Sequence, residues 1–347
     1  MSYLTQQALG SEPIGVVAAI SAFNHPLNLI VHQVVPAIAV GCPIIVKPAT
    51  TTPLCCLEFV ALVREAGLPE PWCQTFLPEH TALAEALATD SRVAFLSFIG
   101  SASVGWRLHS KLAPGTRCAL EHGGAAPVIV DRSANLDQTI PSLVMGGYYH
   151  AGQVCVSTQR IFVHEAVKVE FLARFTEAVK ALEVGDPLSP TTEVGPLILP
   201  KEADRVMSWI DEAEAAGAAV STGAERLSET MVGPTILVEP PPSVRVSREE
   251  VFGPVTCVYG FNSLEAVFQA ANSLPVAFQA AIFTQDLACA LQMSRRLDAS
   301  AVMINDHTAF RADWMPFAGR RQSGYGIGGI PWTMREMTQE KMIVFRA

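Results

Sequence analysis

One cysteine and one glutamate have the chemistry needed to form a thioester and then hydrolyse it. Cys155 lies in the segment 152–160, among small and polar residues, and Glu121 directly precedes His122 and a pair of glycines. A thiolate can attack a carbonyl carbon, and a carboxylate can activate water against the acyl group that the sulfur then carries. If both side chains face one cleft, the protein is an enzyme that works through a covalent intermediate.

Cys155 also has a structural interpretation, because a free cysteine is most often a buried packing residue. The chain contains 8 cysteines, none of them in a CxxC pair, and most lie in apolar segments. This pattern is typical of reduced thiols in a cytoplasmic protein, and it favours neither a disulfide framework nor a zinc site. We therefore expect a cytoplasmic location and no bound metal.

The composition predicts a large core and a net negative charge. The chain has 347 residues, of which 50% are hydrophobic and 16% are charged, and its net charge is -9. This length is typical of two domains, and the lack of a basic run disfavours a nucleic-acid partner. The longest apolar stretch, 26–46, is interrupted by Pro36 and Pro43, which predicts a buried helix and strand rather than a membrane span. The first residues lack the basic start and apolar core of a signal peptide.

Short β-branched runs alternate with helix-length segments along the chain. Continuous apolar strands in such an alternation predict an α/β fold with a doubly wound parallel sheet. In the first half we expect strands at 14–20, 43–47, 73–77, 92–98, 117–120 and 127–131, and helices at 27–40, 53–65, 81–88 and after residue 101. In the second half we expect strands at 160–163, 218–221, 235–238, 256–259, 280–283 and 301–304, and helices at 135–151, 165–182, 201–216, 263–272 and 287–297.

The tail from Arg311 onward is rich in glycine and aromatic residues and is expected to be irregular. Its end, residues 341–345, is short, apolar and strand-like, with no obvious partner. Such a strand could complete a sheet in another subunit.

Nine sequence motifs, in one order from Glu12 onward, resemble the NAD(P)-dependent aldehyde dehydrogenase superfamily. They are EPIGVV at 12–17, FNHP at 23–26, VKP at 46–48, FIGS at 98–101, LEHGG at 120–124, GQVC at 152–155, GPL at 195–197, EEVFGP at 249–254 and PFAG at 316–319. One such motif would be weak, whereas nine in order are specific. The resemblance implies a doubly wound parallel-sheet cofactor domain and a second α/β catalytic domain.

The resemblance also implies three catalytic roles. Cys155 matches the nucleophile of the family, and Asn24 matches the donor that, with the Cys155 backbone N–H, stabilises the negative oxygen of the adduct. Glu121 matches the general base that directs water onto the thioester. Relatives that pass the acyl group to coenzyme A usually lack this glutamate, so its presence implies hydrolysis to a free acid. The alternatives are a turn residue for Asn24 and a surface glutamate at a strand end for Glu121.

The expected cofactor is NAD or NADP. Gly100 and Ser101 end a strand and begin a helix, where free backbone N–H groups could bind a pyrophosphate, although the spacing to Gly105 departs from the GxGxxG motif. Lys47 matches the lysine that contacts the adenosine ribose, and Glu250 the glutamate that holds the nicotinamide ribose. The expected cofactor-binding residues are Phe23, Lys47, Thr50, Gly100, Ser101, Gly105, Gly123, Glu250 and Phe252.

Thr50 is a departure from the pattern of many NAD-preferring relatives, which carry glutamate there to bind the ribose 2′-hydroxyl. A carboxylate would repel a 2′-phosphate, whereas a hydroxyl would not. We therefore expect that NADP is accepted, alone or beside NAD.

The tail 305–317 resembles that of relatives that oxidise small polar or anionic aldehydes. Arg311 could pair with such an anion, His25 could add a donor, and Phe317 would line the substrate site. Arg311 could instead form a structural salt bridge with Asp306 or Asp313. Some anion-specific relatives carry arginine directly before the nucleophile, where this chain has Val154.

The resemblance implies four segments: a remnant of an oligomerisation strand at 1–12, a cofactor domain at 13–124 that lacks its N-terminal part, a catalytic domain at 125–325, and a tail with an oligomerisation strand at 326–347. Relatives are usually well over a hundred residues longer, so we expect missing helices to leave apolar sheet surface uncovered. The expected partners are a small aldehyde and further copies of the chain, in a dimer or tetramer. The competing hypothesis is a truncated scaffold or subunit that keeps the fold without turnover.

Overall fold

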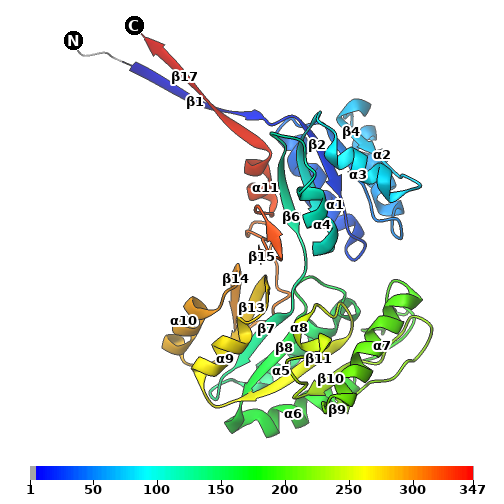
Figure 1. Cartoon of the computed structure of the whole chain (residues 1–347), viewed down its shortest axis with the longest axis vertical. Coiled ribbons are helices and arrows are strands. Elements are labelled where there is room, and N and C mark those ends of the chain that lie inside the picture. Colours follow the sequence, from blue (N-terminus) through cyan, green and yellow to red (C-terminus); the bar gives the residue numbers. More distant parts are fainter. Residues whose placement is uncertain (1–4, 347) are drawn as a thin grey trace. The chain divides into compact units, whose positions relative to one another are not determined.

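The computed structural model describes residues 5–346, which form two compact α/β units, each with its own sheet (Figure 1). The first unit contains the chain up to His122, the segment Ala312–Ala318 and the chain from Gly324 onward. The second contains Gly123–Arg311 and Gly319–Ser323. The tail therefore contributes to both units. No helix in the described part of the chain is long and apolar enough to cross a membrane.

The first unit contains a six-stranded sheet in the order β16-β6-β5-β2-β3-β4. Its strands are β2 (Val16–Ile20), β3 (Ile44–Lys47), β4 (Cys73–Thr75), β5 (Val93–Ile99), β6 (Arg117–Glu121) and β16 (Gly324–Tyr325). All neighbours pair in parallel except β16, which runs antiparallel to β6. The chain runs from β2 outward to β3 and β4, and then continues on the other side of β2 with β5 and β6. The doubly wound order is thus as predicted, with its reversal between β2 and β5.

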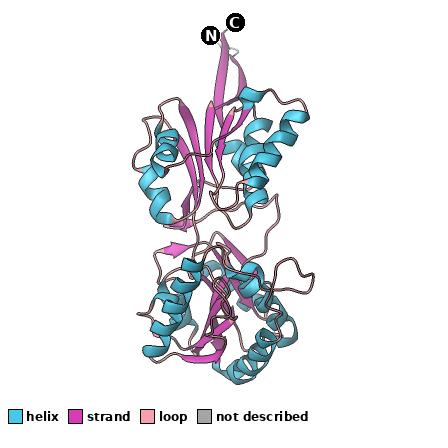
Figure 2. Cartoon of the chain, turned by 90° about the vertical axis from the view of Figure 1, so that its right-hand side faces the viewer, coloured by secondary structure: helices cyan, strands magenta, loops and turns pink. Residues whose placement is uncertain are grey.

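Helices cover both faces of this sheet, as Figure 2 shows. On one face α1 (Pro26–Ala39) and α2 (Leu54–Glu65) pack with the buried core that also contains Met337, next to α11 (Ile330–Glu336). On the other face lie α3 (Thr81–Thr89) and α4 (Ala102–His109). A short 3-10 helix, η1 (Glu70–Trp72), precedes β4.

The expectation of uncovered apolar sheet surface is wrong for the central strands. Val17, Ala18 and Ala19 of β2 are 0% exposed because helices from both faces pack against them. Exposed apolar side chains lie on α2 instead, where Leu54 is 74% and Leu62 is 54% exposed.

The terminal strand predicted at 341–345 is present, but it has a partner within the chain. β1 (Thr5–Pro13) and β17 (Thr338–Arg346) form an antiparallel two-stranded ribbon with Ser11 opposite Glu340. An ion pair of 2.8 Å between Lys341 Nζ and Glu12 Oε1 links the two strands. The sequence could not reveal this pairing, because the two strands lie at opposite ends of the chain.

The second unit contains a seven-stranded sheet in the order β14-β13-β7-β8-β11-β10-β9. The strands are β7 (Ala126–Val130), β8 (Thr158–His164), β9 (Ala219–Thr222), β10 (Thr235–Val238), β11 (Val255–Phe261), β13 (Gln279–Phe283) and β14 (Ala301–Ile304). Only β9 runs antiparallel to its neighbour. The longer helices are α5 (Leu136–Tyr148), α6 (Glu165–Lys180), α7 (Pro200–Ala215), α9 (Leu264–Ala271) and α10 (Leu287–Arg296). Buried side chains of α9 and α10 pack with β7, β8 and β13 in one core.

The predicted helices and strands of both units are present, with three differences. The helix expected at 135–151 ends at Tyr148, because a 3-10 turn, η2 (Tyr149–Gly152), contains residues with left-handed backbone. The tail is not wholly irregular, since it contains α11, β16 and β15 (Arg320–Arg321). β15 pairs with β12 (Val276–Ala277), and these two strands, like the single turn α8 (Arg245–Arg248), are too short to leave a periodic signal in the sequence.

Candidate active site

The predicted residues of the first unit lie at the carboxyl ends of its parallel strands. Asn24 follows β2, Lys47 ends β3, Gly100 follows β5 and Glu121 ends β6. The pairing places Ile20 opposite Lys47, and it places Glu121 opposite Ile99. The structure therefore brings residues from four separate segments to one edge of the sheet. This edge includes the reversal of strand order, where doubly wound proteins bind dinucleotides.

The turn between β2 and α1 holds Phe23, Asn24 and His25. Asn24 is 8% exposed, so its amide is largely withdrawn from bulk water. His25 is the residue that caps α1, and Pro26 occupies the first helical position, where its fixed φ suits the start of a helix. The turn is thus set by the strand on one side and by a proline-started helix on the other.

Lys47 and Thr50 differ in their exposure to water. Burial lowers the pKa of the Lys47 ammonium group, because removal from water disfavours its charge. Thr50 is exposed and presents an uncharged hydroxyl. No carboxylate at position 50 would therefore oppose an anion next to Lys47.

Packing around His122 explains the glycine at 105, and a Cβ on Gly100 would lie 3.0 Å from Phe98 Cζ. The Gly100 N–H donates to the Glu121 carbonyl at 3.0 Å, and His122 Nδ1 lies 2.8 Å from the Gly100 carbonyl oxygen. A Cβ atom on Gly105 would lie 2.0 Å from His122 Cε1, so the histidine ring occupies that space. Ser101 caps the eight-residue helix α4. Contact of these residues with a cofactor stays a prediction.

In the second unit, Cys155 follows a loop with an unusual backbone. His150, Ala151 and Gly152 have φ values of 60°, 54° and 69°, a left-handed conformation that is unfavourable for the first two residues. A Cβ on Gly152 would lie 2.0 Å from the Gly253 carbonyl oxygen, so only glycine fits there. The half-buried Cys155 is therefore positioned by a backbone that the surrounding structure must enforce.

Buried hydrogen bonds anchor both sides of this loop. Gln153 Nε2 donates to the His150 carbonyl at 3.2 Å, and its Oε1 accepts from the Ile198 N–H at 2.9 Å. After the cysteine, the Ser157 hydroxyl lies 3.3 Å from the carbonyl oxygens of Gly146 and Gly147. These contacts fix the loop at its entry and at its exit.

Tyr149 is influenced electrostatically by both Cys155 and Arg311, a relation that sequence reasoning missed. Burial raises the pKa of the Tyr149 phenol, the nearby Cys155 raises it further, and the Arg311 guanidinium lowers it. Arg311, proposed as an anion-binding residue, thus acts electrostatically on the same phenol as the candidate nucleophile. Proximity in sequence to Cys155 was the only signal that could have singled out Tyr149.

Glu250 packs directly over Gly123. A Cβ on Gly123 would lie 1.6 Å from Glu250 Oε1, so the glycine is needed for this contact. Burial raises the pKa of Glu250 to about 8, and a backbone hydrogen bond from Gly124 opposes the rise. Oε1 is buried without a hydrogen-bond partner among the described residues, and Phe252, with φ of 47°, follows two residues later. A buried carboxylate oxygen without a hydrogen-bond partner is suited to accept a hydrogen bond from a ribose hydroxyl.

The remaining predicted substrate residues fall in different units. Arg311 belongs to the second unit, whereas Phe317 belongs to the first, where it is 3% exposed and exchanges backbone hydrogen bonds with Gly328. Of the two acids considered as salt-bridge partners for Arg311, Asp313 pairs with His32 at 3.2 Å and Asp306 lies 3.8 Å from His307 Nε2.

The predicted catalytic residues are likewise divided, with Asn24 and Glu121 in the first unit and Cys155 in the second. No group of three or more His, Cys, Asp or Glu side chains within residues 5–346 is arranged to hold a metal ion.

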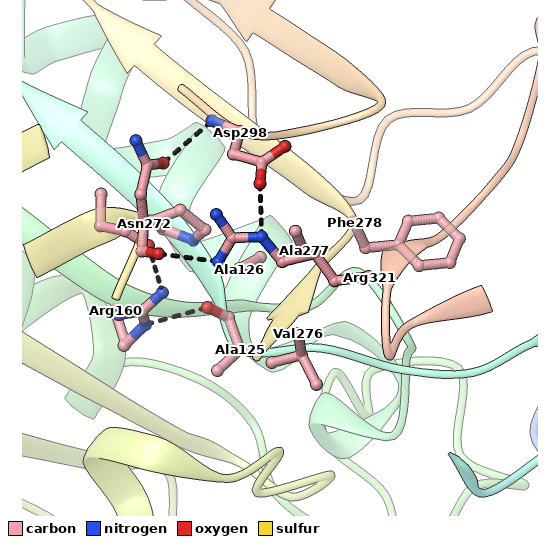
Figure 3. A pocket seen from close by; sticks show the side chains of 11 residues that line it. Ala125, Ala126, Arg160, Asn272, Val276, Ala277, Phe278, Asp298 and Arg321 are labelled. Carbon is pink, nitrogen blue, oxygen red and sulfur yellow. Dashed lines mark hydrogen bonds and ion pairs between the residues drawn. The ribbon is translucent and has the colours of Figure 1, made fainter. Parts of the chain in front are cut away.

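One small pocket of the second unit, about 10 Å³ in volume, is lined by none of the predicted site residues (Figure 3). Arg160, 4% exposed, projects into it and donates to the carbonyl oxygens of Ala125, Ala270 and Ala271 at 2.9–3.1 Å. Arg321 pairs there with Asp298. Since the side chains of Arg160 and Arg321 already bind carbonyl and carboxylate groups of the protein, we assign the pocket a structural role.

Comparison with known proteins identifies one family. The model of the aldehyde dehydrogenase family matches residues 4–343. A 3-sulfolactaldehyde dehydrogenase of Priestia aryabhattai is 36% identical over 332 residues, which cover 96% of this chain and 69% of that protein.

Solved structures agree with this result. Aldehyde dehydrogenase 21 from Physcomitrella patens, in complex with its product succinate, has a TM-score of 0.95 at 35% identity and covers 99% of this chain and 71% of its own. Glyceraldehyde-3-phosphate dehydrogenase from Methanocaldococcus jannaschii, complexed with NADP, has a TM-score of 0.95 at 33% identity and covers 99% and 75%.

The raised pKa of Glu250 predicts a fall in stability with rising pH. The folded protein keeps the carboxyl protonated up to about pH 8, whereas the unfolded chain releases the proton near its ordinary value of 4.5. Folding is therefore disfavoured progressively as pH rises through this window. Urea unfolding of Glu250→Gln should match the wild type near pH 4.5 and exceed its midpoint at pH 8.5. Glu249→Gln, at the exposed neighbouring position, is the control. The prediction is contradicted if the urea midpoints of all three proteins depend on pH in the same way.

Proposed function

This chain belongs to the aldehyde dehydrogenase family, and we propose that it oxidises a small aldehyde to the carboxylic acid through a thioester on Cys155, with NAD or NADP as the oxidant. The observation that carries the proposal is the position of Cys155, half-buried after a left-handed loop that hydrogen bonds hold on both sides. A backbone under such constraint is typical of a site where one side chain must be aimed.

The reaction begins when the Cys155 thiolate attacks the aldehyde carbon and the carbonyl oxygen becomes negative. The Asn24 amide and the Cys155 backbone N–H donate to this oxygen and stabilise the thiohemiacetal without protonating it. The low exposure of Asn24 supports the role, since a donor withdrawn from water acts more strongly.

A bound nicotinamide cofactor would supply the acceptor for the hydride of the former aldehyde carbon. Glu250 would hold its ribose through the unpartnered Oε1, with Gly123 leaving room for the carboxyl group, while Lys47 and the backbone at Gly100 and Ser101 would bind the remainder. Glu121 then takes a proton from water as the water attacks the thioester. The carbon–sulfur bond breaks, the acid leaves and the Cys155 thiol is restored.

Substitution of Cys155 and Glu121 tests these roles separately. Cys155→Ser should lower aldehyde-dependent formation of reduced cofactor by at least about 1,000-fold, because a hydroxyl is a far weaker nucleophile at neutral pH. Glu121→Gln should retain one rapid turnover of reduced cofactor per site and then slow about 100-fold, since general-base catalysis typically contributes 10²–10⁴-fold. Stopped-flow absorbance measures both phases, with Cys289→Ser as the control. If the wild type reduces no cofactor with any aldehyde, the non-catalytic scaffold becomes the better account.

We propose that the cofactor site accepts NADP. The exposed hydroxyl of Thr50 carries no charge to repel a 2′-phosphate, and the Methanocaldococcus relative is complexed with NADP. Thr50→Glu should raise KM for NADP about tenfold, which corresponds to about 1.4 kcal/mol of repulsion, and leave KM for NAD nearly constant. Steady-state rates with each cofactor measure this, with the exposed Thr51→Glu as the matched control. A wild type that rejects NADP would refute it.

We propose that the substrate is a small anionic or hydroxylated aldehyde, recognised by Arg311 with the help of His25 and Phe317. The electrostatic influence of Arg311 on Tyr149, which also feels Cys155, supports this choice. The named substrate of the Priestia relative and the succinate bound to the Physcomitrella relative are both anions.

The substrate proposal predicts a selective effect of Arg311. Arg311→Ala should lower kcat/KM for succinate semialdehyde about 10- to 100-fold, since a charge-assisted hydrogen bond contributes about 1.5–3 kcal/mol. Activity on the uncharged butanal should change little. Arg132→Ala, an exposed arginine of the same unit, is the control. Equal effects of Arg311→Ala on both aldehydes would remove the anion hypothesis.

We also propose a cytoplasmic homo-oligomer, a dimer or tetramer. The ribbon of β1 and β17 supports this, because Met342, Ile343, Val344 and Phe345 are exposed on it. Light scattering of the purified chain would measure the assembly.

A further inference from the structure

The tail segment Arg320–Ser323 is held in the second unit by an arginine clamp, which we define as Arg321, Asp298 and the carbonyl groups of Asn272 and Leu274. Figure 3 shows Arg321, Asp298 and Asn272 of this clamp. Arg321 Nε lies 2.5 Å from Asp298 Oδ2, and Nη1 donates to the Asn272 and Leu274 carbonyls at 2.9 and 2.6 Å. Asp298 is itself fixed, because its backbone N–H donates to Asn272 Oδ1 at 2.9 Å. One guanidinium group thus joins three separate acceptors.

The backbone of Arg321 is strained at this point. Its φ is 53°, in the left-handed region that is unfavourable for a residue with a side chain. Such a conformation persists only where surrounding contacts hold it. Backbone pairing with Val276 and the Gln322 N–H bond to the Pro275 carbonyl hold this backbone, and the clamp adds contacts through the side chain of the strained residue itself.

The residues that follow the clamp lead directly to the strand of Glu121. The buried Ser323 accepts a hydrogen bond through Oγ from the Ala277 N–H at 3.0 Å. The next residue, Gly324, begins β16 and lies opposite Glu121 in the antiparallel pairing with β6. On the other side of β6, Ile99 of β5 lies opposite Glu121. The backbone of Glu121 is therefore held between β5 and β16.

β16 contains only Gly324 and Tyr325, so its own ladder with β6 can do little to hold it in place. A strand of this length keeps its register only when the chain on either side is already ordered. Downstream, Gly326 turns with φ of 75° and packs on Ala119. Upstream, the segment is held by the arginine clamp, by the pairing of β15 with β12, and by an ion pair of 2.9 Å between Arg320 and Asp298.

We propose that the arginine clamp positions Glu121 for its attack on the thioester, and that Arg321 and Asp298 are positioning residues of the deacylation step. The clamp fixes the turn at Arg321, and the turn places Gly324 next to β6. The pairing of Gly324 with Glu121 then fixes the backbone position from which the Glu121 carboxylate contacts the attacking water. The inference rests on the proposed function of Glu121, because it assigns the clamp to that residue's step.

Pre-steady-state kinetics of two variants test the inference. Arg321→Ala removes the guanidinium group, and Asp298→Asn removes the negative charge that pairs with both Arg320 and Arg321, so the second variant remains informative if the first folds poorly. Arg296→Ala is the control, since Arg296 pairs with Glu265 in the same unit without binding the tail. Reduced cofactor is followed by stopped-flow absorbance with a saturating aldehyde.

The expected result is a burst of one reduced cofactor per site at the wild-type rate, followed by a steady state about 10- to 100-fold slower, as a small misplacement of a catalytic group can produce. Glu121→Gln should give the same pattern. Equal losses in the burst and in the steady state would show that the clamp only stabilises the fold, and would overturn the proposal. Unchanged kinetics in both variants would overturn it as well.

Hydrogen exchange measured by mass spectrometry separates this inference from the proposed function. In Arg321→Ala the peptides that contain residues 117–121 and 324–325 should lose protection, while those of β2 and β3 keep theirs. Retained protection of residues 117–121 would refute the positioning role whether or not the enzyme is active. If the wild-type protein reduces no cofactor, the proposed function is refuted. The effect of the clamp on β6 is then judged from hydrogen exchange alone.

Discussion

Parallel pairing of β2 with β3 on one side and β5 on the other is the constraint on which the first unit depends. Ile20 lies opposite both Lys47 and Phe98, so the three strands end at one level. Because helices bury β2 on both faces, a slip of one residue would turn apolar side chains away from the helix that each one contacts. The register is therefore firmly specified, and with it the places at which the turn of Asn24 and the turn of Gly100 emerge.

In the second unit, the candidate site residues are positioned by local departures from regular structure, which the surrounding packing tolerates. His150 and Ala151 adopt left-handed backbone, and the Glu250 carboxyl group is buried against Gly123. Each departure costs stability in isolation. Their concentration in the segments that precede β7, β8 and β11 agrees with the rule that violations of local preference collect where function needs them.

Two arginines join irregular segments of this unit, the buried Arg160 and the exposed Arg321. Arg160 is a buried cation that donates to three backbone carbonyls, two of which belong to Ala270 and Ala271, the last two residues of α9. Burial lowers the pKa of its guanidinium to about 10, which still leaves it charged at neutral pH. The carboxyl end of a helix favours such a cation. Arg321, a residue of the tail, differs in that it pairs with a carboxylate, that of Asp298, as well as with backbone carbonyls (Figure 3).

The sequence by itself determined the order of helices and strands and singled out Cys155, Glu121, Gly123 and Glu250 as unusual. Apolar periodicity and glycine positions are local signals, and nine motifs in order are specific. The contact between Gly123 and Glu250 explains one of those glycines in steric terms. The assignment of catalytic and cofactor roles to these residues stays a prediction.

Only the tertiary structure decided the pairing of β1 with β17, the pairing of Gly324 with Glu121, and the electrostatic influence of Arg311 on Tyr149. It also ended α5 at Tyr148, where the residues that follow have ordinary helical propensity. In each case the deciding contact joins residues far apart in the chain or forces a backbone that local preference opposes. Two-residue strands and left-handed turns carry no periodic signal, because packing from elsewhere in the chain selects them.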